Sequence, residues 1–248
     1  MNDDRADGVR ARGLSEVERV VDVFVAPAAT FRDILRSASW WLPFALTVVA
    51  MVGVTVAIQR QVGWDQVVET QIQMTPSMQS QMTSLTPEAQ ADRMHTMVLS
   101  YEYSAFAAPL IVLALSALAA LVLWASFMFG LGSKASYGQI LCLWMYCSLP
   151  RLLASVVTVA TLYFGGSPES FNIKDPVGTN LAYYLPDAPA WLREFLGFGD
   201  AIGLWVLALL VVGSSIVAKV KPGQAAAVIV GWWLLIVIAA VSVTAAFS

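Results

Sequence analysis

The sequence predicts an all-α protein: a polytopic membrane helical bundle of five transmembrane helices, with amphipathic surface helices beside them. Of its 248 residues, 58% are apolar and only 12% are charged, whereas about 25% of residues are charged in soluble domains. Each of five uncharged stretches is close to the length that crosses a hydrocarbon core of about 30 Å. These stretches are 37–59, 103–133, 135–150, 201–218 and 222–248.

The segment 1–38 precedes the first stretch and is predicted to form two amphipathic helices. Ser15 and Glu18 have the spacing of a capping box, and Pro27 separates the two helices. We expect both helices to lie flat on the membrane; the alternative is that they pack against the chain's own loops. The expected apolar face of the first helix holds Val17, Val20, Val21 and Phe24, and its polar face holds Glu18, Arg19 and Asp22. The expected apolar face of the second helix holds Phe31, Ile34 and Leu35, and its polar face holds Arg32, Asp33 and Arg36.

The remainder, 39–248, is predicted to be the membrane domain. Its spans are about 40–58, 104–130, 137–164, 201–218 and 223–246, with Trp40 and Trp41 in the aromatic belt.

Two polar outer loops, 59–103 and 165–200, separate these spans. In the first, Thr75-Pro76 and Thr86-Pro87 each read as a helix N-cap followed by proline, and the helix from Pro87 is expected to run on into the second span. In the second loop, a short helix after Asp187 is expected to rest on the membrane surface.

The distribution of Lys and Arg predicts the orientation, because these residues are enriched in cytoplasmic loops. They occur in the N-terminal segment, at Lys134 after the second span, and at Lys219 and Lys221 after the fourth. We therefore expect a multi-pass protein of the cell's inner membrane, with a cytoplasmic N-terminus and an extracytoplasmic C-terminus.

Arg151, preceded by Pro150, lies in the middle of the third span. A cation at that depth costs about 2.5–3.5 kcal/mol on insertion scales, so it needs a partner. Candidate partners are Glu102 or Asp200 at the outer span ends, the cytoplasmic end of a broken helix, and carbonyls freed by Pro150. Arg151 either lines an anion path of a transporter or channel, or is a structural residue of a kinked helix.

A methionine-rich run in the first outer loop suggests a second alternative, copper handling. Soft thioethers with one imidazole suit Cu(I), but Pro76 leaves Met74 outside the helix and methionine is a common packing residue. The residues concerned are Met74, Met78, Met82, Met94, His95 and Met97. Cys142 and Cys147 are about 140° apart on a helix and read as buried apolar residues.

Gly223, Ala227 and Gly231 form a small-residue face on the fifth span, for which packing within the bundle is a sufficient explanation. Motifs for hydrolysis, phosphate binding and nucleic-acid binding are missing from the sequence. We therefore expect no enzyme activity, cofactor, metal, nucleotide or nucleic acid.

Short motifs along the chain resemble the bacterial branch of the YIP1 family. They are Phe24, Pro27, Thr30, Phe31 and Ile34, then Trp41 and Pro43, then Ala135 to Tyr137 with Gln139, Pro150, the loop Phe171 to Asn180, Lys219 to Lys221, and Gly231 to Trp233. The resemblance covers about Val21 to Ala246 and implies five spans with a cytoplasmic N-terminus. It adds loop residues to the candidate functional set, which is Pro150, Arg151, Asn172, Asp175, Pro176 and Asn180.

The expected function is that of a non-enzymatic scaffold or accessory subunit of a membrane assembly. Some bacterial relatives look like accessory subunits of ABC-type exporters, and membrane-organisation machinery is the other such assembly. The expected partners are the lipid bilayer and either a membrane protein or a second copy of the chain. The GTPase partner of eukaryotic relatives is not carried over, because the N-terminal segment here is short.

Overall fold

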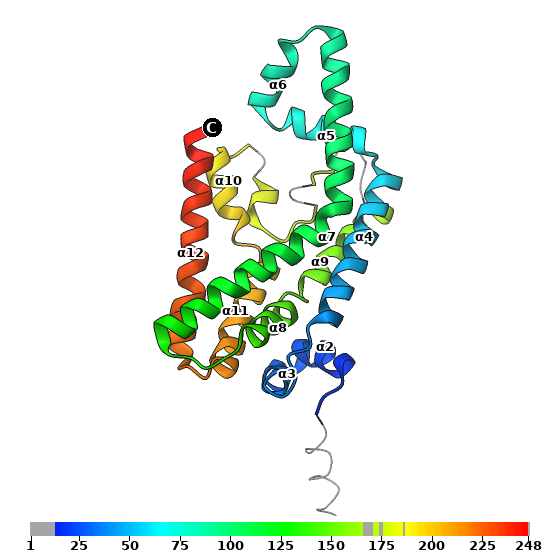
Figure 1. The fold of residues 1–248 in the computed structure, drawn as a ribbon. Helices are drawn as coiled ribbons and strands as arrows, with labels where there is room; N and C mark the ends of the chain where they lie inside the picture. The colour runs from blue at the N-terminus through cyan, green and yellow to red at the C-terminus, as the bar shows by residue number, and fades with distance from the viewer. Residues whose placement is uncertain (1–12, 166–170, 174–175, 186, 248) are drawn as a thin grey trace, which may run out of the picture.

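The computed structural model describes residues 13–165, 171–173, 176–185 and 187–247, and every regular element in them is helical (Figure 1). The all-α class is therefore confirmed. The elements are α2 (Glu16–Val25), α3 (Pro27–Ile34), α4 (Trp41–Gln61), α5 (Trp64–Gln73), α6 (Pro76–Thr83), α7 (Pro87–Leu131), α8 (Tyr137–Cys147), α9 (Arg151–Phe164), the 3-10 helix η2 (Leu181–Tyr184), α10 (Ala190–Gly197), α11 (Ala201–Val217) and α12 (Pro222–Phe247).

Four segments are long and apolar enough to cross a membrane: Trp41–Gln61, Pro87–Leu131, Tyr137–Phe164 and Pro222–Ala246. A fifth candidate is the pair α10 and α11, which is bent by 48° at the break between them. The sequence predicted that 201–218 crosses alone, but α11 has only 17 residues. The structure therefore supports a multi-pass protein of four or five crossings.

Helix α7 is far longer than a membrane crossing requires. At about 1.5 Å per residue, its 45 residues extend over roughly 67 Å, about twice the thickness of a hydrocarbon core. The Thr86 hydroxyl accepts from the Ala89 amide and caps its start, as predicted. The helix bends along its length (Figure 1), and Pro109 inside it removes one backbone donor. The outer loop and second span are thus one continuous element.

Helix α8 is the centre of the larger core. Seven of its residues are buried: Ile140, Leu141, Cys142, Leu143, Met145, Tyr146 and Cys147. The two cysteines are free and buried, as the sequence indicated. A capping box formed by Ser136 and Gln139 starts this helix. Helices α3, α7 and α11 pack around it, so α8 is shielded by its own chain more than the other candidate crossings are.

Helix α3 does not expose its whole apolar face to a membrane. Phe31 and Ile34 are fully buried and belong to the α8 core. A Cβ built at Gly213 of α11 would meet ring carbons of Phe31 at 3.2 Å and would clash with Leu143. A glycine is therefore needed where α3 and α8 converge on α11, and α3 packs against these helices rather than against the loops named in the alternative.

Helix α2 buries one residue of its predicted polar face, Arg19, whereas Glu18 is exposed and Val20 and Phe24 pack against the core. Its capping box of Ser15 and Glu18 is present, but its buried side carries Arg19 and Val23. Val17, Val21 and Val25 lie on the outer surface. The reason is that Arg19 finds hydrogen-bond partners inside, so its burial leaves no donor without an acceptor.

The small-residue face of α12 also differs from expectation. Gly223, Ala227 and Gly231 are exposed, and a Cβ at either glycine would meet no atom within 4 Å. Packing among the described helices therefore does not account for this face.

Candidate functional site

The third candidate crossing is broken where α8 ends and α9 begins. Pro150 stands at the N-cap of α9 and has no amide hydrogen to donate. Turn bonds bridge the gap: the Leu149 amide donates to the Tyr146 carbonyl, and the Arg151 amide donates to the Ser148 carbonyl, both at 3.1 Å. The break thus satisfies its own backbone and places Arg151 at the first position of α9.

The side chain of Arg151 is exposed and makes no hydrogen bond or ion pair with the described residues. Of the partners expected from the sequence, Asp200 is engaged elsewhere. Its Oδ1 accepts from the amides of Ile202 and Gly203 at 3.0 Å and caps α11. The guanidinium is therefore available to a group outside the described chain.

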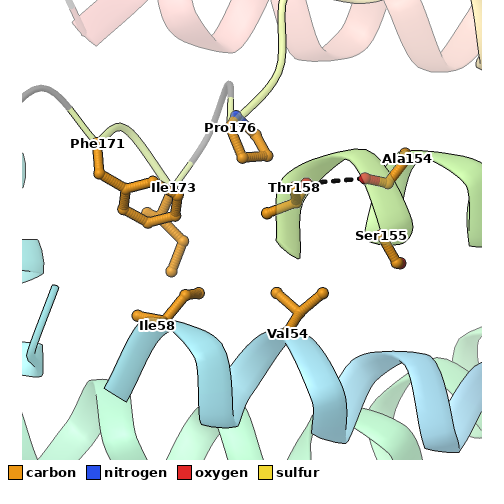
Figure 2. A pocket seen from close by; sticks show the side chains of 8 residues that line it. All are labelled: Val54, Ile58, Ala154, Ser155, Thr158, Phe171, Ile173 and Pro176. Carbon is orange, nitrogen blue, oxygen red and sulfur yellow. Dashed lines mark hydrogen bonds between the residues drawn. The ribbon is translucent and has the colours of Figure 1, made fainter. Parts of the chain in front are cut away.

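An apolar pocket of about 220 Å³ lies between α4, α9 and the second outer loop. Figure 2 shows Val54 and Ile58 of α4 pointing into it from one side, with Phe171, Ile173 and Pro176 of the loop opposite. Helix α9 completes the lining with Ala154, Ser155 and Thr158. The pocket brings together segments that are far apart in the sequence.

The pocket wall and Arg151 share one face of α9. Arg151, Ser155 and Thr158 are spaced four and three residues apart, and such residues are neighbours on a helix surface. The Thr158 hydroxyl donates to the Ala154 carbonyl at 2.9 Å, and the Ser155 hydroxyl donates to the Arg151 carbonyl at 3.4 Å. Because the hydroxyl protons of Ser155 and Thr158 are donated within α9, the pocket has a largely apolar lining. The guanidinium of Arg151 belongs to a residue about one helical turn before Ser155.

The loop that closes the pocket is anchored to the first outer loop. Phe171 packs with Ile58 and Trp64 in a second apolar cluster. Asn172 Oδ1 accepts a hydrogen bond of 3.3 Å from Nε2 of Gln71, a buried residue of α5. The indole N–H of Trp64 is buried without a partner among the described residues. The two outer loops are therefore packed as one unit at this point.

The structure places the candidate residues taken from the sequence at different points around this site. Pro176 lines the pocket, and Asn172 lies next to two lining residues. Asn180 is further along the loop, where its Oδ1 accepts from the Tyr183 amide at 3.1 Å and caps η2. Asp175 lies outside the described residues. Sequence reasoning missed Val54, Ile58, Ser155 and Thr158; the spacing of the last two from Arg151 was the available signal.

The methionines of the first outer loop lie on three different helices or at their ends: Met74 at the end of α5, Met78 and Met82 on α6, and Met94 and Met97 on α7. Helix α6 buries none of its residues. The described part of the chain contains no group of three His, Cys, Asp or Glu side chains placed to hold a metal ion. Copper handling stays a prediction that the geometry does not strengthen.

A buried polar network ties α2 and α3 to the core, and sequence reasoning missed it as well. Arg19 NH1 donates to the Ser37 carbonyl at 3.0 Å, and Thr30 donates its hydroxyl proton to the Arg19 carbonyl at 3.0 Å. The Tyr146 hydroxyl donates to Glu16 Oε2 at 2.9 Å. The network connects the start of the described chain to α8.

Charge pairing shifts the pKa values in this network. Burial alone would lower the pKa of Arg19 and raise that of Asp33. Hydrogen bonds and charge attraction outweigh burial, so the pKa of the Arg19 guanidinium is raised and the pKa of the Asp33 carboxyl is lowered. Both groups are thereby held in their charged forms.

Comparison with known proteins gives one family match. The family model of the Yip1 domain matches residues 21–243, which is most of the chain. No curated protein and no solved structure matches the sequence.

Proposed function

The chain belongs to the Yip1 family of membrane proteins, and from this premise we propose that it is a non-enzymatic scaffold or accessory subunit of a membrane assembly. We further propose that it is a bacterial member resident in the inner membrane. By analogy with some bacterial relatives, an ABC-type exporter is one such assembly, and membrane-organisation machinery is another.

The observation that carries this proposal is an arm formed by α5, α6 and the first part of α7. Figure 1 shows the arm at the end of the molecule opposite α2 and α3. Because α7 is about twice the length of a crossing, a large part of it must lie outside the hydrocarbon core. Helix α6 contributes no side chain to the core. An arm of this kind offers a partner a large accessible surface.

The orientation in the proposal places the arm outside the cytoplasm. Lys134, Lys219 and Lys221 lie in the connections at the other end of the helices, where positively charged residues favour the cytoplasmic side. Helices α2 and α3 lie at that same end, and the C-terminal end of α12 lies toward the arm (Figure 1). This orientation supports a cytoplasmic N-terminus and an extracytoplasmic partner.

The proposal is tested by purifying the tagged protein from its native membranes in mild detergent and identifying bound proteins by mass spectrometry. A second preparation replaces Pro76–Thr83 with a Gly-Ser linker, and Lys221→Gln at the opposite end is the matched control. We expect a stoichiometric partner with the original protein and the control, and its loss with the linker variant. Recovery of the protein alone, together with solute transport in proteoliposomes, would replace this proposal with the transporter alternative.

A further inference from the structure

Arg151 lies near the middle of its crossing. It is 14 residues after Tyr137 and 13 before Phe164, the two ends of the candidate span. At about 1.5 Å per residue, it is roughly 20 Å along the helices from either end. A cation at such a position is costly unless it faces protein or water, so it needs a balancing group.

The apolar parts of the candidate crossings supply no carboxylate for this purpose, because Glu88, Asp92 and Glu102 lie in the first part of α7, and Glu194 and Asp200 lie before α11. The stretches 37–59, 103–133, 135–150, 201–218 and 222–248 contain no Asp or Glu. Residues 152–164, which complete the crossing after Arg151, contain none either. A second copy of the chain would bring the same apolar stretches without Asp or Glu, so these stretches could not balance the charge at this depth.

The pocket above Arg151 has the size of a site for side chains. Its volume of about 220 Å³ is smaller than the roughly 300–1,000 Å³ of typical small-molecule sites. Its lining is apolar apart from two hydroxyl groups that donate to their own helix. One or two apolar side chains of a neighbouring helix therefore suit it better than a complete small-molecule ligand.

We propose that Arg151 and the pocket dock a membrane-spanning helix of another protein, which carries a carboxylate at mid-membrane depth opposite Arg151. Apolar side chains of that helix, one to two turns toward the arm, occupy the pocket. This inference rests on the proposed accessory function and specifies the chemistry of the partner. The contact with Arg151 lies at mid-span and the pocket lies next to the second outer loop, whereas the arm provides a separate contact beyond both.

The test uses purified full-length protein in phosphatidylcholine vesicles with fluorescent synthetic leucine helices. One peptide carries a single central Glu and its control carries Gln at the same position. Energy transfer between labelled protein and peptide measures their association. We expect the Glu peptide to associate about tenfold more tightly than the Gln peptide, as for polar contacts between membrane helices.

The variants Arg151→Gln and Arg151→Lys identify the responsible group. Arg151→Gln should remove the preference for Glu, whereas Arg151→Lys should retain part of it because the charge remains. Size-exclusion profiles and melting temperatures equal to those of the original protein show that both variants are folded. Equal association of the two peptides with the original protein overturns the inference.

Two further measurements exclude other sources of negative charge. Adding phosphatidylglycerol to the vesicles should not change the preference for the Glu peptide. If the preference disappears, a lipid phosphate pairs with Arg151, and the proposal is overturned. Asp175→Asn should not change the preference; a clear increase would identify an internal counter-ion and also overturn it. Replacement of α6 does not alter this peptide assay, so failure of the inference is distinguishable from failure of the proposed function.

Discussion

The guanidinium of Arg19 on α2 donates from Nε to Oδ2 of Asp33 on α3 at 2.7 Å, and this pair fixes the two helices against each other. Only 1% of the Arg19 side chain is exposed. Arg19→Gln should lower the free energy of unfolding by about 3 kcal/mol, because it removes the buried partner of Asp33 and leaves the carboxylate bonded only to the exposed Arg36. Thermal unfolding in detergent measures the change. Arg32→Gln, on the exposed side of α3, is the control and should have little effect; equal losses would show that the pair is not specific.

The bonds that Asp33 accepts from Arg36 and from Arg19 outweigh its burial and predict a dependence of stability on pH. Because the pKa of Asp33 is lowered in the folded protein, its contribution is complete above the ordinary aspartate value of about 3.9. The contribution is lost as the pH falls from that value through the lowered pKa. Melting temperatures between pH 7 and pH 3 should decline more steeply for the original protein than for Asp33→Asn. Parallel curves would contradict this assignment.

Two glycines with different surroundings provide a matched pair of substitutions. Gly213→Ala should destabilise the protein by about 1–3 kcal/mol, because the added methyl group meets Phe31 and Leu143 in a packed core. Gly231→Ala adds the same methyl group where no atom lies within 4 Å, and should stabilise the helix by up to about 1 kcal/mol. Chemical denaturation of both variants measures the difference. The packing argument fails if Gly213→Ala is as stable as Gly231→Ala.

Labelling with a membrane-impermeant maleimide tests the orientation. The native Cys142 and Cys147 have no exposed area, so the folded protein should not react. In right-side-out vesicles, Met78→Cys on α6 should react, whereas Lys221→Cys should react only after the vesicles are opened. The opposite pattern would place the arm in the cytoplasm and invert the proposed topology.

The sequence predicted the helical class and most helix starts because those signals are local. Ser15, Thr86 and the prolines that follow Thr75 and Thr86 act within one turn of the chain, and the uncharged stretches are visible without tertiary information. The sequence also predicted that the helix starting at Pro87 continues into the second crossing, because no helix-ending signal separates them.

The burial of Arg19 on α2 could not be predicted in the same way. Periodicity placed Arg19 on a polar outer face, but Asp33 and Ser37 satisfy its donors from the next helix. Likewise, Val54 and Ile58 are ordinary apolar residues of a membrane helix until Phe171 and Pro176 lie opposite them (Figure 2). Both features depend on contacts between residues distant in the sequence, which composition and spacing do not encode.

Helix α7 has a mechanical consequence. Helix α7 runs without interruption from the tip of the arm to the packed residues Ala120, Leu123 and Phe127. A force on the tip is therefore transmitted along α7 to the helical bundle. Pro109 lies near the middle of α7, where the missing backbone hydrogen bond lowers the resistance of the helix to bending. A load on the arm should therefore bend α7 at Pro109 before it displaces the packed residues of the C-terminal half.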